Sequence, residues 1–310
     1  MSAPLLVILG PTASGKTELA LHLAAAFGGE IVSCDSVQVY RGFDIGSAKT
    51  TPGERRGIPH HLIDVAAPDQ VFTAGDYARL ARQTLAEISA RENLPIVVGG
   101  TGFYLRALLH GLFQGPERDG ALRANLVSRE RRRPGSLHRI LRRVDAASAA
   151  RIHPHDVNKT IRAIEVCLLA RQPMSVLFGQ GRDELRGFDA IKIGLDPPRP
   201  DLYTRIDQRL ARMFDRGLLD EVAHLLASGI DATAKPFESL GYKQALQVIR
   251  GELAIEDAVA SATMETRRYA KRQMTWFRRE IAVRWIGGFG DCPEVQRELF
   301  EFVQQRLRLS

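Results

Sequence analysis

The segment GPTASGKT at residues 10–17 constrains the fold of this chain more than any other, because it follows the pattern G-x-x-x-x-G-K-[ST]. The apolar run Leu5–Leu9 before it is typical of a buried strand, and Leu19, Leu23 and Phe27 recur at helical spacing behind it. A strand, a glycine-rich loop and a helix in this order direct backbone N–H groups and the positive end of the helix dipole at phosphate oxygens. We therefore predict a diphosphate or triphosphate site formed by Gly10, Pro11, Thr12, Ala13, Ser14, Gly15, Lys16 and Thr17.

Two side chains of this loop indicate how the phosphates are held. Lys16 adds a positive charge, and Thr17 offers its hydroxyl to a magnesium ion, so Mg²⁺ is the expected cofactor. An ordinary glycine-containing turn is the alternative, which the flanking strand and helix disfavour. The loop alone leaves open whether a phosphoryl group is transferred.

Apolar runs and helical spacing alternate along the rest of the chain. We expect strands at Glu30–Cys34, His61–Val65, Ile96–Val98 and Ile191–Leu195, with a helix at Phe72–Arg91. This order predicts an α/β fold with a doubly wound parallel sheet, whose ligands lie at the carboxyl ends of the strands. Further helices are expected at Tyr203–Phe214, Leu218–Ala227, Ser239–Arg250 and Ile255–Arg279.

Composition divides the chain into two parts. Residues 1–114 and 191–310 form the predicted phosphate-loop core with its helical C-terminal part, and residues 115–190 form an inserted, mostly helical domain. No run approaches 18 apolar residues, no signal-peptide pattern precedes the first strand, and the three cysteines match neither a zinc site nor a disulfide framework. We therefore expect a cytoplasmic protein without a membrane partner. No heptad pattern predicts an oligomer, so a monomer is expected.

Positive charge gathers in two places. The chain carries 43 Lys and Arg against 36 Asp and Glu, a net charge of +7. Residues 129–143 contain seven arginines and one acid, and residues 267–279 interleave six basic residues with three aromatic ones. Either cluster alone is as consistent with a solvated helix face as with a ligand site. Beside a phosphate loop, the two together favour a polyanionic partner.

Polar residues follow two of the expected strands. Asp35 is placed to hold magnesium, to act as a general base, or to cap a helix. The amide of Gln38 both donates and accepts, which suits an adenine edge. Gly99–Gly102 allows close backbone approach to a ligand, and Thr101 offers a hydroxyl there or caps the next helix. Arg205 and Arg209 could clamp a diphosphate, or lie on an exposed face paired with an aspartate in the same helix.

Several segments, in order, resemble the bacterial tRNA dimethylallyltransferases, also called isopentenyl-tRNA transferases. They are GPTASGKT, DSVQVYRGFDIGSAKT, PHHLIDV, VVGGTGFYLRALL, NKTIRAIEV, SLGYKQA and TRRYAKRQMTWFRR, which span about Val7 to Arg279. The pairing of the phosphate loop with DSxQxYRGxDIGSAK is the specific part of this resemblance.

The resemblance implies a prenyltransferase with a nucleotide-kinase-like core that takes dimethylallyl diphosphate as donor. Its acceptor would be the exocyclic amine of the adenine 3′ to the anticodon, at tRNA position 37. Thr12–Thr17 would hold the diphosphate, Asp35 would be the general base, and Thr101 would help the diphosphate depart. The implied tRNA contacts are Asp35, Ser36, Val37, Gln38, Thr101, Arg123, Asn158, Lys159, Thr160, Ile161, Arg162, Ser239, Leu240, Gly241, Tyr242, Lys243, Lys271, Arg272, Gln273, Trp276 and Arg278.

This chain departs from the family pattern in the tRNA-contacting segments. Asn158-Lys159 stands where Gln-Arg is usual, and Lys243 replaces an arginine, which keeps the charge but loses the bidentate fork. Three other functions stay open on the residues alone: an ATP-dependent kinase, a prenyltransferase acting on free adenine nucleotides, and a non-catalytic RNA-binding module. The basic clusters disfavour the first two, and Asp35 beside Thr101 disfavours the third.

Overall fold

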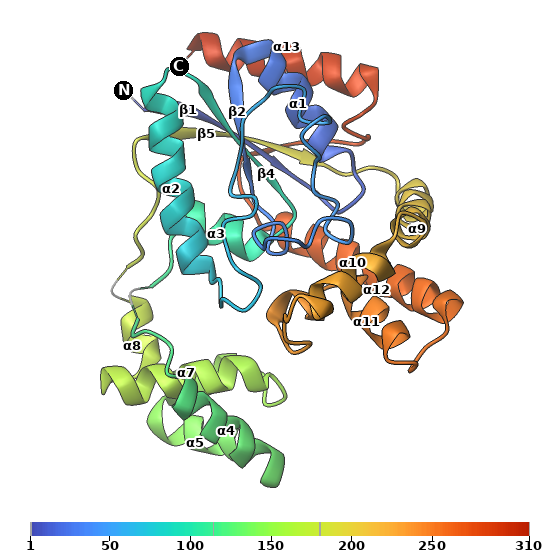
Figure 1. The fold of residues 1–310 in the computed structure, drawn as a ribbon. Coiled ribbons are helices and arrows are strands. Elements are labelled where there is room, and N and C mark those ends of the chain that lie inside the picture. The colour runs from blue at the N-terminus through green and yellow to red at the C-terminus, as the bar shows by residue number, and fades with distance from the viewer. Residues whose placement is uncertain (1, 114, 180, 310) are drawn as a thin grey trace. The chain divides into compact units, whose positions relative to one another are not determined.

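One parallel β-sheet organises the larger part of the protein (Figure 1). The structure is a computed structural model that describes residues 2–113, 115–179 and 181–309. Within these residues the sheet has six strands in the order β3-β2-β4-β1-β5-β6. Their bounds are β1 (Ala3–Leu9), β2 (Gly29–Ser33), β3 (His60–His61), β4 (Leu94–Gly99), β5 (Phe188–Leu195) and β6 (Val283–Ile286). Because β1 pairs with β4 on one side and β5 on the other, the strand order reverses there and opens a crevice at its carboxyl end.

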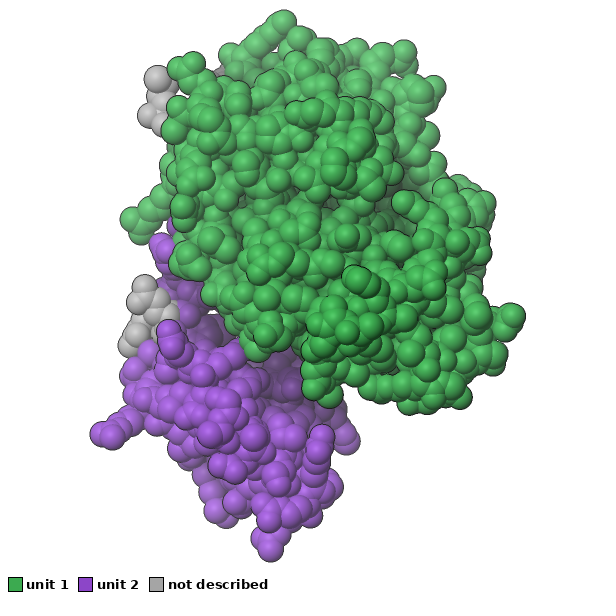
Figure 2. All heavy atoms as spheres, in the orientation of Figure 1, with its two compact units in different colours: residues 1–109, 185–310 green, residues 110–184 purple. Residues whose placement is uncertain are grey.

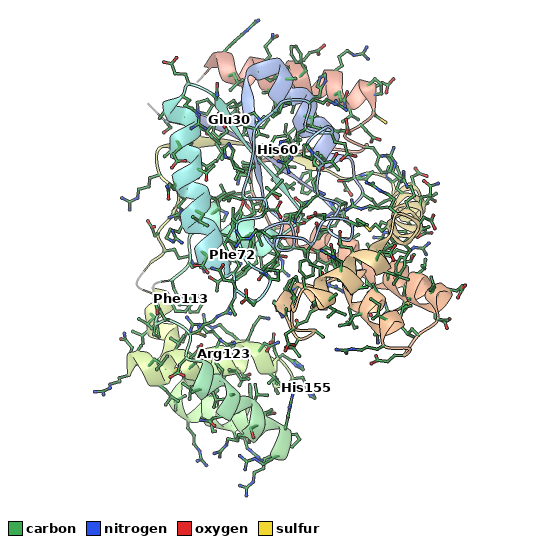
Figure 3. All side chains as sticks on the ribbon, in the orientation of Figure 1. Glu30, His60, Phe72, Phe113, Arg123 and His155 are labelled. Atoms are coloured by element: carbon green, nitrogen blue, oxygen red, sulfur yellow. The ribbon has the colours of Figure 1, made fainter. Side chains whose placement is uncertain are left out.

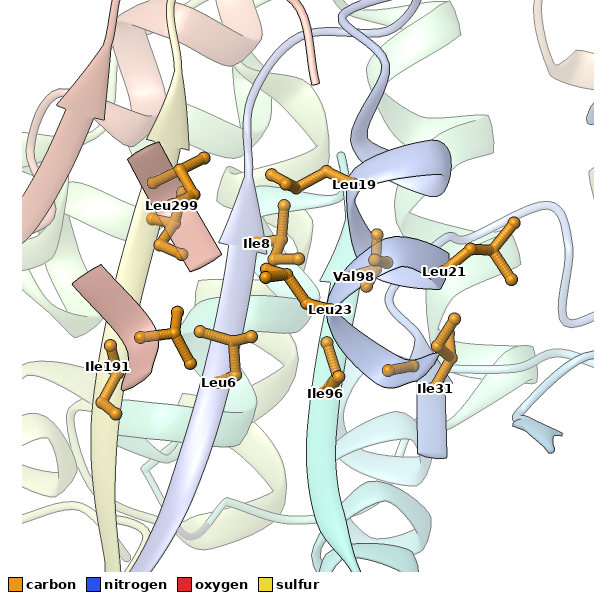
Figure 4. Close-up of a cluster of buried hydrophobic side chains, with 14 of the residues drawn as sticks. Leu6, Ile8, Leu19, Leu21, Leu23, Ile31, Ile96, Val98, Ile191 and Leu299 are labelled. Atoms are coloured by element: carbon orange, nitrogen blue, oxygen red, sulfur yellow. The ribbon is translucent and has the colours of Figure 1, made fainter. Parts of the chain in front are cut away.

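Helices cover both faces of this sheet. On one face α1 (Lys16–Phe27) and α13 (Pro293–Leu309) pack on the strands, with Leu6, Ile8 and Leu19 in the buried cluster of Figure 4. Side chains of a strand alternate between faces, so the buried Leu5 and Val7 face the other side. There α2 (Ala74–Ala90) contacts β2 and β4, and α3 (Gly102–His110) follows β4 directly. The predicted doubly wound α/β fold is confirmed.

The segment after β5 adds a helical layer beside the crevice. It consists of α9 (Arg199–Asp215), α10 (Leu218–Ala227), the short 3₁₀ turn η1 (Lys235–Glu238), α11 (Tyr242–Ile249) and α12 (Ile255–Phe277). Helix α12 packs against α9 and α11, which brings its C-terminal half to the phosphate loop. Helix α11 begins three residues later than the spacing from Ser239 predicts, because Gly241 takes a left-handed φ of 87°.

Residues 110–184 form a second compact unit (Figure 2, purple). Its helices are α4 (Gly120–Arg132), α5 (Ser136–Val144), α6 (Ala146–Arg151), α7 (Val157–Ala170) and α8 (Met174–Gly179). Leu137, Leu141, Ile161 and Ile164 are at the centre of its own apolar core. The insertion was expected at residues 115–190, whereas this unit spans residues 110–184. Residue 114, the last residue expected before the insertion, lies outside the described residues.

Two expectations about the strands are wrong. The strand expected at His61–Val65 is limited to β3, since Leu62 and Asp64 take left-handed φ values of 60° and 59° that end the extended backbone. The C-terminal part, expected to be helical throughout, contains β6, which pairs with β5 through Lys192 and Val283. A four-residue edge strand is too short for its periodicity to be recognised.

No helix in the described part of the chain has both the length and the apolar character needed to cross a lipid bilayer.

Candidate active site

The phosphate loop has a fixed backbone conformation. Gly10 and Gly15 have φ values of 150° and 84°, and a Cβ on Gly15 would lie 2.8 Å from Asp291 Oδ1. Inside the loop, the Ser14 hydroxyl donates to Pro11 O at 2.8 Å, and Gly290 N–H donates to Ser14 O at 2.9 Å from the loop after β6. Glycine is therefore required at position 15, where a side chain would displace the neighbouring loop.

Gln273 of α12 joins two loops at the carboxyl edge of the sheet. Its side chain is 5% exposed, its Oε1 accepts from Thr12 N–H at 2.9 Å, and its Nε2 donates to Gly100 O at 2.8 Å. Sequence reasoning assigned Gln273 only to tRNA. In this structure, its amide connects the phosphate loop to the loop that carries Thr101.

Asp35 and Thr101 lie on adjacent loops that follow β2 and β4. Asp35 Oδ1 accepts from the N–H groups of Val37 and Gln38 at 2.8 and 3.2 Å, and no described residue donates to its Oδ2. The Thr101 hydroxyl accepts from Ser36 N–H at 3.1 Å, while Thr101 N–H donates to Cys34 O. The loops are thus held to each other, and one carboxylate oxygen of Asp35 is free.

Two pockets meet at Asp35. The first, which we call the phosphate-loop pocket, is lined by Lys16 and Thr17 and extends across the end of β2. The second, which we call the Arg272 pocket, is bordered by α9, α12 and the 239–240 segment. The residues that line both pockets are Thr12, Asp35, Ser47, Arg209 and Tyr269. A ligand in either pocket would therefore have access to the Asp35 carboxylate.

Two cations dominate the phosphate-loop pocket. Burial, followed by the charge of Arg209, lowers the pKa of Lys16 from 10.5 to about 7, while Asp35 raises it. Burial also lowers the pKa of Arg209, which makes no hydrogen bond or ion pair within the described residues. Two closely placed cations with a single nearby carboxylate favour a polyanionic ligand. The Lys16 side chain donates to Pro11 O at 2.5 Å.

Arg205 and Arg209 differ in their surroundings, although they lie one turn apart on α9. Arg205 forms a two-pronged ion pair with Asp291 at 2.7 and 2.8 Å and lies over the Phe289 ring. The pairing with Asp201 or Asp207 is not observed, since Asp207 pairs with Arg267 of α12. Sequence spacing alone could not distinguish the two arginines, because Arg205 pairs with Asp291, 86 residues away, whereas Arg209 lines the phosphate-loop pocket.

Gln38 uses its amide within the protein. Its Oε1 accepts from Ser33 Oγ at 2.9 Å, and its Nε2 contacts the carbonyl oxygens of Ser47 and Ala48 at 3.2 and 3.3 Å. An adenine bound to this amide would replace those contacts. The assignment of Gln38 to adenine remains a prediction.

The predicted tRNA contacts of the C-terminal helices divide by exposure. Lys271 and Arg272 are exposed on α12, and Arg272 lines the Arg272 pocket with Ser239 and Leu240. Other predicted tRNA contacts are engaged within the protein. Tyr242 is buried and donates to Glu221, and the Trp276 ring lies against Gly102. Lys243 pairs with Glu265, and Arg278 pairs with Asp196. Lys271 and Arg272 are therefore the members most available to a partner.

In the second unit, Arg123 and Arg162 both pair with Glu165, whose side chain is fully buried (Arg123 is labelled in Figure 3). Thr160 and Ile161 are buried in the core of the unit, whereas Asn158 and Lys159 are exposed. Apart from Arg123, the arginines of α4, α5 and their connection are all exposed, and within the described residues none of these forms an ion pair: Arg129, Arg131, Arg132, Arg133, Arg139, Arg142 and Arg143. A surface of unneutralised arginines suits a polyanion.

Several residues of the phosphate-loop pocket were not predicted as site residues, among them Tyr269 and His60. His60 lines the phosphate-loop pocket, and its Nε2 is buried without a hydrogen-bond partner among the described residues. The segment PHHLIDV was noted only as a motif, and the strand expected there began at His61, so no role was expected for His60. Among the same described residues, no group of three or more His, Cys, Asp or Glu side chains could hold a metal ion.

Comparisons with known proteins agree on one family. The family model described as IPP transferase matches residues 38–280. A tRNA dimethylallyltransferase of Solibacter usitatus is 60% identical over 304 residues, covering 98% of this chain and 99% of that protein. One of Koribacter versatilis is 57% identical over 306 residues, covering 98% and 99%.

Solved structures of this family share the fold. A full-length tRNA isopentenylpyrophosphate transferase of Bacillus halodurans is 36% identical, covers 98% of this chain and 97% of its own, and has a TM-score of 0.72. A eukaryotic dimethylallyltransferase, described as acting on tRNA, is 25% identical, with coverage of 98% and 80% and a TM-score of 0.84. These matches exclude the kinase and the non-catalytic module. The chain belongs to the IPP transferase family, and it is a prenyltransferase.

Proposed function

We propose that the protein transfers a dimethylallyl group from dimethylallyl diphosphate to the exocyclic amine of the adenine 3′ to the anticodon of a tRNA. The products are N6-dimethylallyladenosine at position 37 and diphosphate. The observation that carries this proposal is the meeting of two pockets at Asp35, one containing the phosphate loop and the other bordered by the exposed Arg272. Family membership supports prenyl transfer to tRNA as the reaction class.

The donor is assigned to the phosphate-loop pocket. Lys16, Arg209 and the backbone N–H groups of the loop would stabilise the charge that develops on the diphosphate as its bond to carbon breaks. The oxygens of Thr17 and Asp35 line the same pocket and are of the kind that magnesium prefers, so the residues fit such an ion. When bound, magnesium would neutralise part of the diphosphate charge.

Asp35 is assigned as the general base. The exocyclic amine of adenine is a poor nucleophile because its lone pair is delocalised into the ring, so removal of a proton assists attack. The two backbone N–H groups on Oδ1 orient the carboxylate, and Oδ2 has no donor among the described residues and is available for that proton. Such catalysis typically contributes ~10²–10⁴-fold. Thr101, beside Ser36, would donate its hydroxyl hydrogen to the departing diphosphate.

The acceptor is assigned to the Arg272 pocket. The target base must leave the anticodon stack, at a cost of a few kcal/mol, and contacts between cations and phosphates offset that cost. Lys271 and Arg272 on α12, and the seven exposed arginines of residues 129–143, would supply these contacts. Because one chain supplies both pockets, we propose that it works as a monomer, in the cytoplasm.

Replacement of Asp35 tests the chemical step. Asp35→Asn keeps an oxygen for the N–H groups of Val37 and Gln38 but no longer takes up a proton. We expect the single-turnover rate with saturating donor and tRNA to fall at least ~10²-fold, with tRNA affinity changed less than about threefold.

The matched control is Asp64→Asn, which removes an exposed carboxylate that pairs with Lys49 outside both pockets. It should react at the wild-type rate. A single-turnover rate for Asp35→Asn within threefold of wild type would remove Asp35 from the role of base.

A further inference from the structure

Tyr269 of α12 lies where the two pockets meet, and the proposed reaction gives it no role. Its side chain lines both the phosphate-loop pocket and the Arg272 pocket. The Tyr269 hydroxyl has the side chains of Thr101 and Gln273 as hydrogen-bonding partners, and burial raises the pKa of this phenol above its usual value. The hydroxyl therefore keeps its hydrogen near pH 7, with one hydrogen to donate and two lone pairs to accept.

The partner on the same helix has a fixed orientation. Gln273 lies one turn after Tyr269, so both side chains are on one face of α12. Gln273 Oε1 accepts from Thr12 N–H at 2.9 Å, and Nε2 donates one hydrogen to Gly100 O at 2.8 Å. An amide nitrogen has a second hydrogen, for which the Tyr269 oxygen is available as acceptor. Gln273 thus connects the Tyr269 hydroxyl to the same two loops that it joins.

The partner on the other side is the hydroxyl of Thr101. Its oxygen accepts from Ser36 N–H at 3.1 Å, and it lies 3.4 Å from Ser36 Oγ, a long contact for two hydroxyls. The proposed function sends the Thr101 hydrogen to the departing diphosphate, so the Thr101 oxygen can then only accept. The Tyr269 hydroxyl is the donor that remains for its second lone pair.

We propose that Tyr269 is a positioning residue for the departure of the diphosphate: its hydroxyl donates to Thr101 and thereby directs the Thr101 hydrogen at the oxygen that leaves C1. The inference rests on the proposed function. The bond from the adenine nitrogen to C1 forms, the bond from C1 to the diphosphate oxygen breaks with its electron pair on that oxygen, and the amine proton passes to Asp35. Tyr269 and Thr101 keep their protons and act through hydrogen bonds alone.

Such a chain of donors acts mainly in the transition state. The hydrogen bonds from Gln273 to Tyr269 to Thr101 run in one direction, so each polarises the next, and they strengthen as negative charge develops on the leaving oxygen. Without the Tyr269 hydroxyl, one lone pair of Thr101 is unfilled, and its hydrogen is free to turn toward Ser36 Oγ. The chemical step should therefore suffer more than donor binding.

Tyr269→Phe removes only the hydroxyl. The ring stays beside the Arg272 guanidinium, which lies 5.7 Å from its centroid, and still borders both pockets. Rapid quench with dimethylallyl diphosphate, magnesium and an anticodon stem-loop should show a single-turnover rate that is about 10- to 100-fold lower. Donor affinity, measured by calorimetry with a non-reactive donor analogue, should change less than about threefold, since the hydroxyl contacts Thr101 rather than the donor.

The matched control is Tyr40→Phe. Tyr40 is also buried, its hydroxyl accepts from Phe72 N–H at 3.4 Å, and its side chain lines neither pocket. This variant should react at the wild-type rate, and thermal unfolding of both Phe variants shows whether either has lost its fold.

A second pair of measurements separates positioning from a merely structural contribution. Tyr269→Phe is combined with Thr101→Ser, which keeps a hydroxyl, and with Thr101→Val, which keeps the shape and removes it. Slow turnover is followed with radiolabelled donor over hours. In the Ser background the loss of the Tyr269 hydroxyl should still lower the rate at least about tenfold, whereas in the Val background it should lower it less than about twofold.

Two results would overturn the inference. One is a single-turnover rate for Tyr269→Phe within twofold of wild type. The other is an equal loss in the Ser and Val backgrounds, which would mean that Tyr269 acts independently of Thr101, as a structural residue or by donating to the diphosphate directly. Failure of the proposed function is distinguishable, because the wild-type protein would then leave the stem-loop unlabelled.

Discussion

Gln273 offers a sharp test of how the site is assembled, because one buried amide holds both reactive loops. Gln273→Met keeps the length of the side chain and removes its hydrogen bonds to Thr12 N and Gly100 O, which measure 2.9 and 2.8 Å. Gly100 is buried, so its carbonyl loses its partner without access to water. The loss of one hydrogen bond lowers the free energy of unfolding by about 1 kcal/mol net. The loss at Gly100 O costs about 1–3 kcal/mol, because this carbonyl oxygen is left buried and unpaired. We expect the free energy of unfolding to fall by roughly 2–4 kcal/mol.

The functional effect should exceed this loss of stability. Without the amide, the phosphate loop and the Thr101 loop are no longer fixed to each other, so donor affinity should fall about tenfold and the single-turnover rate more than that. Chemical denaturation, calorimetry with a non-reactive donor analogue and rapid quench measure the three quantities. Gln244→Met is the matched control: Gln244 is also buried and accepts from Gly241 N–H, but it lines neither pocket. The argument fails if both variants lose stability and neither loses donor affinity.

Two further predictions concern charge. Because the pKa of Lys16 is about 7 in the free protein and bound diphosphate raises it, binding should take up nearly one proton at pH 8, and donor affinity should fall as pH rises above 7. Calorimetry in buffers of different ionisation enthalpy measures that uptake; an equal uptake by Lys16→Met would contradict it. Replacing Lys271 and Arg272 by Ala should lower the salt dependence of tRNA affinity by up to about two log units per log salt, with donor affinity unchanged. A slope equal to wild type would mean that these side chains form only a solvated helix face.

Much of the crevice could be predicted from sequence because its parts are local. The phosphate loop lies between its own strand and helix, and Asp35 and Thr101 follow strands whose carboxyl ends meet at one edge of a parallel sheet. The family resemblance assigned the same residues. The strand at 283–286 was missed, and the strand at β3 was expected to be longer than it is. Both gain their structure from neighbours in the sheet rather than from their own periodicity.

The partners of individual side chains could not be predicted. Arg205 and Arg209 have the same local sequence pattern. Only the fold shows that Arg205 pairs with Asp291, 86 residues away, and that Arg209 lines the phosphate-loop pocket. Gln273 contacts residues 261 and 173 positions away, a separation that no local motif encodes. His60 lay just before the strand expected at His61–Val65, and the pocket it lines is formed with residues of α1, β2 and the loop after β3.

Transfer of the prenyl group itself is the most direct test of the account. The protein is incubated with magnesium and radiolabelled dimethylallyl diphosphate, together with an anticodon stem-loop that has three consecutive adenines, the same stem-loop with guanine at the target position, or AMP. We predict label in the first RNA only, recovered after digestion as N6-dimethylallyladenosine, with one diphosphate released per label and no ADP formed when ATP is added. Equal labelling of AMP and the stem-loop, or label in the guanine-substituted RNA, would contradict the assignment of the acceptor.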